Sequence, residues 1–149
     1  MIKRSTFIAM LGICLAVPGM GQSKEDAQAL VKKAIEFSKV NGTYKLIQAV
    51  NRQDPEFRHG ELYIWMVDLE EKNMAAHGAN PKLVGQDFSG AKDPDGFAYA
   101  QKAVEVALAN GSGWIEYKFK HPETQQLATK VCYVEKHKFF VIACGAYKK

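Results

Sequence analysis

The sequence lacks the short motifs that accompany most enzyme active sites. It contains no Gly-x-Ser-x-Gly nucleophile motif, no His-Glu-x-x-His zinc motif and no glycine-rich phosphate-binding loop. His77 and Glu135 could in principle form an acid–base pair, but no nucleophile can be named beside them. We therefore predict that the protein is not an enzyme.

Histidine and cysteine are scarce as well. The chain holds 4 histidines, which are scattered, and 3 cysteines with no Cys-x-x-Cys pair. Metal sites need several such ligands at characteristic spacings, so we expect no metal site and no cofactor. The formal net charge of +4 is too small to predict a nucleic-acid partner.

No apolar run in the sequence is long enough to span a membrane. The longest one that resembles a targeting segment, "FIAMLGICLAV" at residues 7–17, falls well short of the roughly 20 apolar residues that a spanning helix needs. Lys3 and Arg4 precede the run and Pro18 ends it. This pattern is typical of a secretory signal peptide, with an uncleaved membrane anchor as the alternative.

Small residues mark the expected cleavage site. Gly19 and Gly21 stand at the −3 and −1 positions of a cut after residue 21. We predict a signal peptide at 1–21 and a single domain at 22–149, which is periplasmic or secreted and has no membrane span in its mature form. A lipoprotein would need a small residue before Cys14, where Ile13 stands.

Three segments carry the signals of helices. Residues 23–42 begin with Ser23 as a candidate N-cap and end at a glycine, with apolar residues at helical spacing between them. A shorter helix follows, which Thr43 could cap. A third helix is predicted over 97–111, with Phe97 and Leu108 among its buried residues.

Five segments carry the signals of strands: 61–70, 74–78, 112–120, 127–135 and 139–147. Short connections between consecutive strands predict an antiparallel sheet. The fold class is therefore α+β, with a five-stranded antiparallel sheet. We expect the long N-terminal helix on one face of the sheet, and a loop with a shorter helix on the other.

The stretch "MAAHGANPKLVGQDFSG", residues 74–90, shows no steady period of apolar residues. Together with the helix that follows, it could close the second face of the sheet as the wall of a pocket. A surface loop with no such role is the alternative.

Alternation along the strands sorts the candidate binding residues by face. Tyr63 and Trp65 share a face of their strand. Trp114 and Tyr117 are three residues apart, and so are Lys130 and Tyr133, so in regular strands the two members of each pair point to opposite faces. Neither pair can therefore line one face of a regular sheet. Core packing is the alternative role for every aromatic residue. Lys130 stands amid apolar residues, where its ammonium either reaches the sheet edge or receives an anion.

Cys132 and Cys144 lie on consecutive strands and could form a disulfide. A hairpin centred on residue 138 would place them opposite each other on one face, within adjustment of bridging. A turn centred on 137 would instead pair Cys132 with Ile142. Two buried thiols are the alternative to a bridge.

Two long segments resemble single Cache domains of the second type. They are "LYIWMVDLEEKNMAAHGANPKLVGQDFSGAKDPDG" and "GSGWIEYKFKHPETQQLATKVCYVEKHKFFVIACGAY". The motifs "AHG", "NPKLVG", "GSGW" and "K-x-x-YVE", in this order, carry the resemblance. It implies a PAS-like sheet and an extracytoplasmic sensor that binds small molecules, often short carboxylates.

The resemblance also implies a set of ligand-binding residues and a type of partner. Members usually sit between the membrane helices of chemoreceptors and histidine kinases; because this sequence ends at Lys149, we expect a free ligand-binding protein with a membrane receptor or kinase as its partner. An interaction scaffold with a filled pocket is the alternative. The expected ligand is a small organic anion, and the expected ligand-binding residues are His77, Tyr63, Trp65, Trp114, Tyr117, Lys130 and Tyr133.

Overall fold

The computed structural model describes residues 22–149, in which three helices and two short 3₁₀ turns pack on one antiparallel sheet. In chain order the elements are α1 (Lys24–Asn41), α2 (Thr43–Asn51), β1 (Arg58–His59), β2 (Leu62–Asp68), β3 (Asn73–His77), η1 (Pro81–Leu83), η2 (Phe88–Gly90), α3 (Tyr99–Asn110), β4 (Ser112–Lys120), β5 (Leu127–His137) and β6 (Phe140–Tyr147). The predicted signal peptide, residues 1–21, lies outside the described residues. No helix within 22–149 is long and apolar enough to cross a membrane.

The sheet runs in the order β1-β2-β6-β5-β4, and β3 also pairs with β2. All pairings are antiparallel. The five predicted strands are present, and the two-residue β1 is a sixth that the sequence analysis did not predict. It forms because Gly60, with a φ of 57°, turns the chain so that Arg58 pairs with Tyr63.

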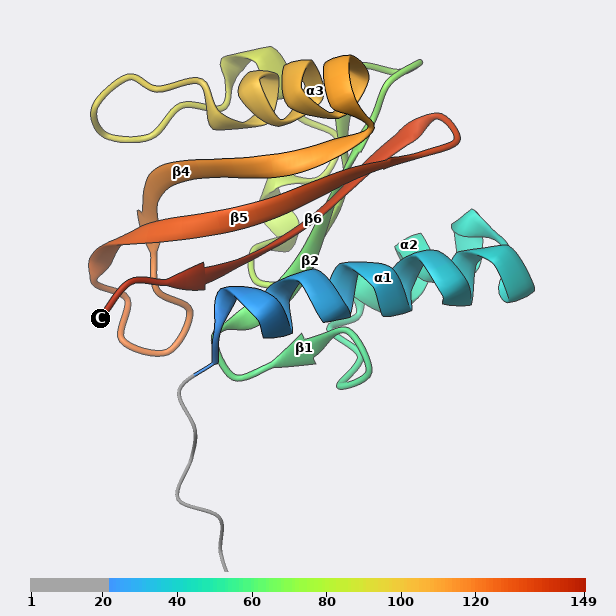
Figure 1. Ribbon diagram of the computed structural model, residues 1–149, viewed down its shortest axis with the longest axis horizontal. Coiled ribbons are helices and arrows are strands. Elements are labelled where there is room, and N and C mark those ends of the chain that lie inside the picture. Colours follow the sequence, from blue (N-terminus) through green and yellow to red (C-terminus); the bar gives the residue numbers. More distant parts are fainter. Residues whose placement is uncertain (1–21) are drawn as a thin grey trace, which may run out of the picture.

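Helix α1 covers one face of the sheet, across β5 and β6, and α2 lies beside it near β3 (Figure 1). Ser23 caps α1 as predicted, in a reciprocal capping box with Asp26. Thr43 does not cap α2. Its hydroxyl lies 2.8 Å from the Ser38 hydroxyl, and the N-cap position is held by Gly42 without a side-chain hydrogen bond.

Helix α3 lies on the opposite face of the sheet, over β4 and β5 (Figure 1). It begins at Tyr99, two residues later than predicted, because the Asp93 carboxylate accepts the amides of Asp95 and Phe97 and holds them in a turn. Phe97 and Leu108, both expected in the core, are 38% and 57% exposed.

Each face of the sheet has its own apolar core. Strand β2 is buried on both sides, so its odd residues, such as Tyr63 and Trp65, face α3, while Ile64 and Met66 face α1 and α2. A long helix on one face and a loop with a shorter helix on the other are the layers that the sequence predicts.

The possible disulfide between Cys132 and Cys144 is not formed, and the alternative of two buried thiols is the one observed. The β5–β6 hairpin closes on a two-residue turn at Lys138 and Phe139, so Cys132 pairs with Gly145 and Cys144 pairs with Tyr133. A shift of one residue in register moves a side chain to the other face. The two cysteines therefore face opposite sides of the sheet, and both are buried free thiols.

Candidate functional site

The structure gathers five of the seven expected residues on the α3 side of the sheet. Lys130 and Tyr117 are cross-strand partners on β5 and β4. The ring of His77, at the end of β3, lies 5.1 Å from the ring of Tyr63. The fifth residue, Trp65, pairs with His77 across β2 and β3.

Lys130 is the most unusual residue of this group, because it is a fully buried cation. Its side chain is 0% exposed, and its ammonium Nζ makes no hydrogen bond within the described residues. Nζ lies 3.8 Å from the ring centre of Tyr63, with Tyr147 at 5.5 Å and Phe119 at 5.8 Å. Aromatic faces stabilise a cation only in part, so a buried, unpaired ammonium favours an anion as its partner.

We define the Lys130 cluster as Lys130 with Tyr63, His77, Phe119 and Tyr147. A glycine makes room for it. A Cβ built at Gly145, opposite Cys132, would come within 2.8 Å of Lys130 Cγ and still closer to Cε. Any other residue at 145 would therefore collide with the Lys130 side chain and force a shift.

His77 is a neutral residue of this cluster. Burial lowers its pKa to about 3, and the positive charges of Lys130 and Arg58 add to the effect. Its Nδ1 accepts the backbone amides of Asn80, at 2.9 Å, and Ala79, at 3.3 Å. Because Nδ1 is an acceptor, the ring proton of the neutral imidazole resides on Nε2.

Aromatic side chains surround the cluster on its remaining sides. Tyr99 of α3 stacks on Tyr117 with 4.4 Å between ring centres, and Trp65 meets Tyr99 edge-on at 6.0 Å. The Trp65 indole Nε1 is a second buried donor without a partner among the described residues. Tyr147 donates from its hydroxyl to the Lys120 carbonyl at 2.8 Å.

Three aromatic residues of this region, Tyr99, Phe119 and Tyr147, were not among the expected site residues. Phe119 has the same strand parity as Tyr117, a signal that was available in the sequence. The position of Tyr147 depends on the β5–β6 register, which pairs it with Lys130. No local sequence pattern marks Tyr99, because its role depends on how α3 lies on the sheet.

Two surface hollows adjoin the Lys130 cluster, and residues of the 74–90 stretch line part of both. One is a groove of about 510 Å³ between the loop after β3 and the β4–β5 hairpin. The other, of about 440 Å³, lies under η1 and η2. Phe119 and Lys92 line both. We call the first the lysine groove, because four lysines line it: Lys82, Lys92, Lys118 and Lys120.

Trp114 and Tyr133 are not part of this arrangement. Both side chains lie on the α1 side of the sheet, where Lys24 lies 5.8 Å from the Trp114 ring and Lys32 lies 5.8 Å from the Tyr133 ring. Glu135 is on the same side, where it pairs with Lys32 at 2.7 Å and accepts the Tyr133 hydroxyl at 2.7 Å. The acid–base pair of His77 with Glu135 therefore does not form.

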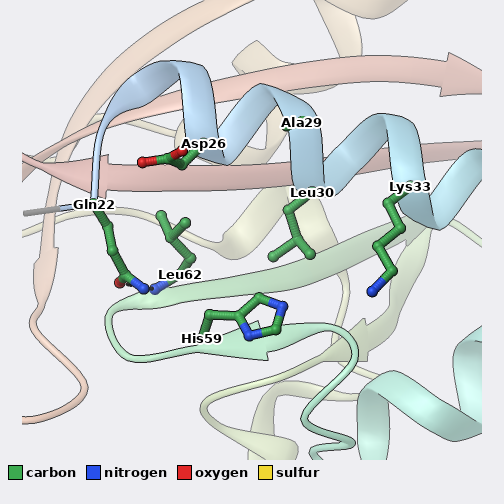
Figure 2. A pocket seen from close by; sticks show the side chains of 7 residues that line it. All are labelled: Gln22, Asp26, Ala29, Leu30, Lys33, His59 and Leu62. Carbon is green, nitrogen blue, oxygen red and sulfur yellow. Dashed lines mark hydrogen bonds between the residues drawn. The ribbon is translucent and has the colours of Figure 1, made fainter. Parts of the chain in front are cut away.

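A further groove, of about 350 Å³, lies between α1 and the β1–β2 hairpin (Figure 2). Three of its four polar side chains, Gln22, Asp26 and Lys33, already have structural roles, and His59 is the fourth. Gln22 Oε1 accepts the amides of Glu61, at 2.8 Å, and Leu62, while Asp26 caps α1. The Lys33 ammonium lies 3.7 Å from the Glu56 carboxylate. These contacts hold α1 and the segment before it against the hairpin and the neighbouring loop. We therefore do not place the functional site in this groove.

Comparison with known proteins finds one family over almost the whole chain. The model of the family described as single Cache domain 2 matches residues 15–149. The methyl-accepting chemotaxis protein McpP of Pseudomonas putida is 37% identical over 87 residues, which are 57% of this chain and 16% of McpP. The chain thus spans about a sixth of the length of that relative.

Solved structures of sensor domains share the fold. A periplasmic sensor domain of a chemotaxis protein matches 84% of this chain and 90% of its own length, at 28% identity and a TM-score of 0.66. A Cache chemosensory domain, solved to explain carboxylic acid recognition, matches 85% of this chain and 93% of its own length, at 25% identity and a TM-score of 0.70. A methyl-accepting chemotaxis protein from Vibrio parahaemolyticus, at 19% identity and a TM-score of 0.70, supports the fold alone.

Proposed function

The chain belongs to the single Cache domain 2 family, and from this premise we propose that it binds a small carboxylate at the Lys130 cluster. A Cache domain senses ligands for signal transduction, and its relatives are parts of chemotaxis receptors. The observation that carries the proposal is the fully buried Lys130 ammonium without a hydrogen-bond partner. A ligand carboxylate would supply the missing anion.

The surrounding groups give the proposed ligand its remaining contacts. Lys130 pairs with one carboxylate oxygen, and His77 donates from Nε2 to the other. His77 suits this role because its imidazole stays neutral and keeps its Nε2 proton at the pH values where the carboxylate is charged. The ligand tail then packs against Phe119, Tyr99 and Tyr117. Tyr99 stacks on Tyr117 and meets Phe119 edge-on at 5.7 Å, and the little space between these rings favours a short apolar chain. Recognition of a carboxylic acid is also the stated subject of one of the similar structures.

The proposed partner of the domain is a membrane receptor or a kinase. Its relatives are sensor domains of chemotaxis receptors, and the predicted signal peptide would deliver this chain to the same compartment. Ligand binding would then be reported to that partner through the surface of the domain. Enzyme chemistry has no role in this proposal.

The test is binding of a panel of carboxylates, from formate to hexanoate with succinate and acetamide, by thermal shift and then by calorimetry. A charge-assisted hydrogen bond contributes about 1.5–3 kcal/mol, so Lys130→Met should weaken binding of the best acid about ten- to a hundredfold. Lys136→Met, on the same strand but exposed, should bind as the wild type does. Equal affinities of the wild type and Lys130→Met would remove Lys130 from the site.

An interaction scaffold remains the second candidate, and one observation favours it. The side chains of the Lys130 cluster pack closely, and Lys130 and Tyr63 are only 0% and 1% exposed. A pocket filled by its own side chains is what a scaffold would show. A scaffold would show no thermal shift with any acid of the panel. A shift of several degrees that grows with acid concentration would decide for the sensor.

A further inference from the structure

We propose that Phe119 is a gate between the lysine groove and Lys130, and that its ring limits the size of the acids that reach the ammonium. The inference rests on the proposed function, because it concerns the access route to the same site. It adds a residue that determines access and specificity without pairing with the carboxylate.

The need for a gate follows from the burial of Lys130. With an exposed fraction of 0%, the ammonium cannot be reached unless a neighbouring group moves. Its aromatic neighbours differ in what lies behind them. Tyr63 is 1% exposed and lines no surface hollow of the described residues. Tyr147 lines a hollow of about 370 Å³ near the ends of the domain, but its hydroxyl is held by the hydrogen bond that it donates to the Lys120 carbonyl at 2.8 Å.

Phe119 is the neighbour that separates Lys130 from a hollow without a hydrogen bond to hold its side chain. Its ring centre lies 5.8 Å from Lys130 Nζ and 5.9 Å from the ring centre of His77. The same side chain lines the lysine groove and the hollow under η1 and η2, and it is partly exposed. One side of the ring therefore meets solvent and the other meets the cluster.

The walls around Phe119 are held by hydrogen bonds from backbone amides to side chains, whereas the Phe119 ring makes no hydrogen bond. The loop after β3 is anchored to His77 Nδ1 through the amides of Ala79 and Asn80. The 93–97 turn is anchored to β4, where Asp93 Oδ2 accepts the Lys118 amide at 3.1 Å. Rotation of a side chain moves fewer groups than opening either wall, so the Phe119 ring is the element that opens.

The charge of the groove suits the entry of an anion. Three of its lysines, Lys82, Lys92 and Lys120, form no salt bridge among the described residues, while Lys118 pairs with Asp95 at 2.8 Å. Asp93 also lines the groove, but its carboxylate accepts three backbone amides, and the lysines leave the lining with an excess of positive charge. Such an excess raises the local concentration of an anion and the rate of its association. An acid would collect in the groove and pass Phe119 to reach Lys130.

A first experiment tests the gate without any ligand. The purified protein is methylated at its lysines with formaldehyde and borohydride, and the rate at each lysine is followed by peptide mass spectrometry. Phe119→Ala should raise the rate at Lys130 by about tenfold or more, because a buried group reacts only through an opening. Phe140→Ala, which removes a partly buried phenylalanine on the α1 side, is the matched control and should leave the Lys130 rate unchanged.

Alkylation of Cys144 in the same samples reports general unfolding, since this thiol is buried on the opposite face. A rise at Lys130 with Cys144 unchanged supports the gate. An unchanged Lys130 rate in Phe119→Ala, or an equal rise at Cys144, would overturn it.

A second experiment measures association and dissociation rates of propionate and hexanoate by stopped-flow tryptophan fluorescence. Phe119→Ala should raise both rates for propionate and improve the affinity for hexanoate relative to propionate by about tenfold. Phe119→Leu should fall between the two proteins. If the wild type binds no acid, the proposed function is wrong, and the methylation result still tests the gate. If the wild type binds acids but Phe119→Ala changes neither the rates nor the preference for chain length, the gate is wrong.

Discussion

At the scale of single residues, the site depends on how Lys130 is accommodated. A buried ammonium beside the Tyr63 ring gives up most of its hydration, and cation–π contact offsets only part of that cost. The space for its side chain exists because residue 145 carries no Cβ. Lys130 and Gly145 should therefore be energetically coupled.

Gly145→Ala should lower the free energy of unfolding by about 1–3 kcal/mol, the usual cost of overpacking a core. The loss should shrink in a Lys130→Ala background, because the colliding methylenes are then absent. Urea unfolding of the four proteins of this cycle measures the coupling. Gly90→Ala is the matched control, since nothing lies within 4 Å of a Cβ built there. Additive losses in the cycle would contradict the coupling.

His77 predicts a dependence of stability on pH. Its pKa is about 3 in the folded protein and near 6.5 in the unfolded chain. The unfolded state therefore binds a proton first as the pH falls. Stability from this residue is present above about pH 6.5 and is lost toward pH 3, with a limiting slope of about 1.4 kcal/mol per pH unit.

His77→Asn keeps an acceptor near the amides of Ala79 and Asn80 but removes this titration. Urea unfolding between pH 7 and pH 4 should show a shallower loss of stability for the variant than for the wild type. The carboxylates titrate in both proteins, so the difference between the two curves isolates His77. Parallel curves would show that His77 protonates as easily in the folded protein as in the unfolded one.

At the scale of elements, β5 serves both faces of the sheet. Its Lys130 and Cys132 face α3, while its Tyr133 and Glu135 face α1 and bind Lys32. The strand therefore connects the proposed ligand site to the long helix. Ligand contacts and helix contacts depend on separate residues of this one strand, which allows them to be altered separately.

Tyr133→Phe should lower the free energy of unfolding by about 1 kcal/mol, because it removes the hydrogen bond that the Tyr133 hydroxyl donates to the Glu135 carboxylate at 2.7 Å. Its affinity for the best carboxylate should stay within about twofold of the wild type, because the ring lies on the far side of the sheet from Lys130. Calorimetry and urea unfolding of the same sample measure the two quantities. A tenfold loss of affinity would return Tyr133 to the list of site residues.

At the scale of the whole molecule, the sheet divides two environments. The α1 and α2 side has an apolar core with charged contacts at its edge and a groove between α1 and the β1–β2 hairpin. The α3 side combines an apolar core with a buried cation and two adjoining hollows. The family places this domain in extracytoplasmic sensing. Export would depend on the predicted signal peptide at 1–21, which lies outside the described residues.

Expression of the full sequence in a Gram-negative host should yield a mature protein that begins at Gln22, because Gly19 and Gly21 form the small-residue site for cleavage. Intact-mass measurement of the periplasmic fraction checks this. Gly21→Leu should slow cleavage and leave the longer protein with the membranes. A mature mass that includes residues 1–21 would show that the segment is retained as an anchor.

The sequence by itself determined the three helices, the five longer strands, their order and the class of fold, but not the two-residue β1. Three features depend only on residues that are close in the sequence, so local patterns reveal them. They are the N-cap Ser23, the alternation of Tyr117 and Phe119 with charged residues, and the strand β2 with apolar residues on both faces. The same patterns predicted that Trp114 and Tyr117 could not share a face. They also singled out Lys130 as a lysine amid apolar residues.

Only the tertiary structure decided which residues meet. The turn at Lys138 and Phe139 fixed the β5–β6 register, and that single step placed Cys144 away from Cys132 and Tyr147 beside Lys130. The packing of α3 on β4 brought Tyr99 onto Tyr117. Register and helix placement are chosen by the packing of the whole core, because each moves an entire set of side chains at once. A site assembled from several strands and a helix therefore has no signature in any one segment.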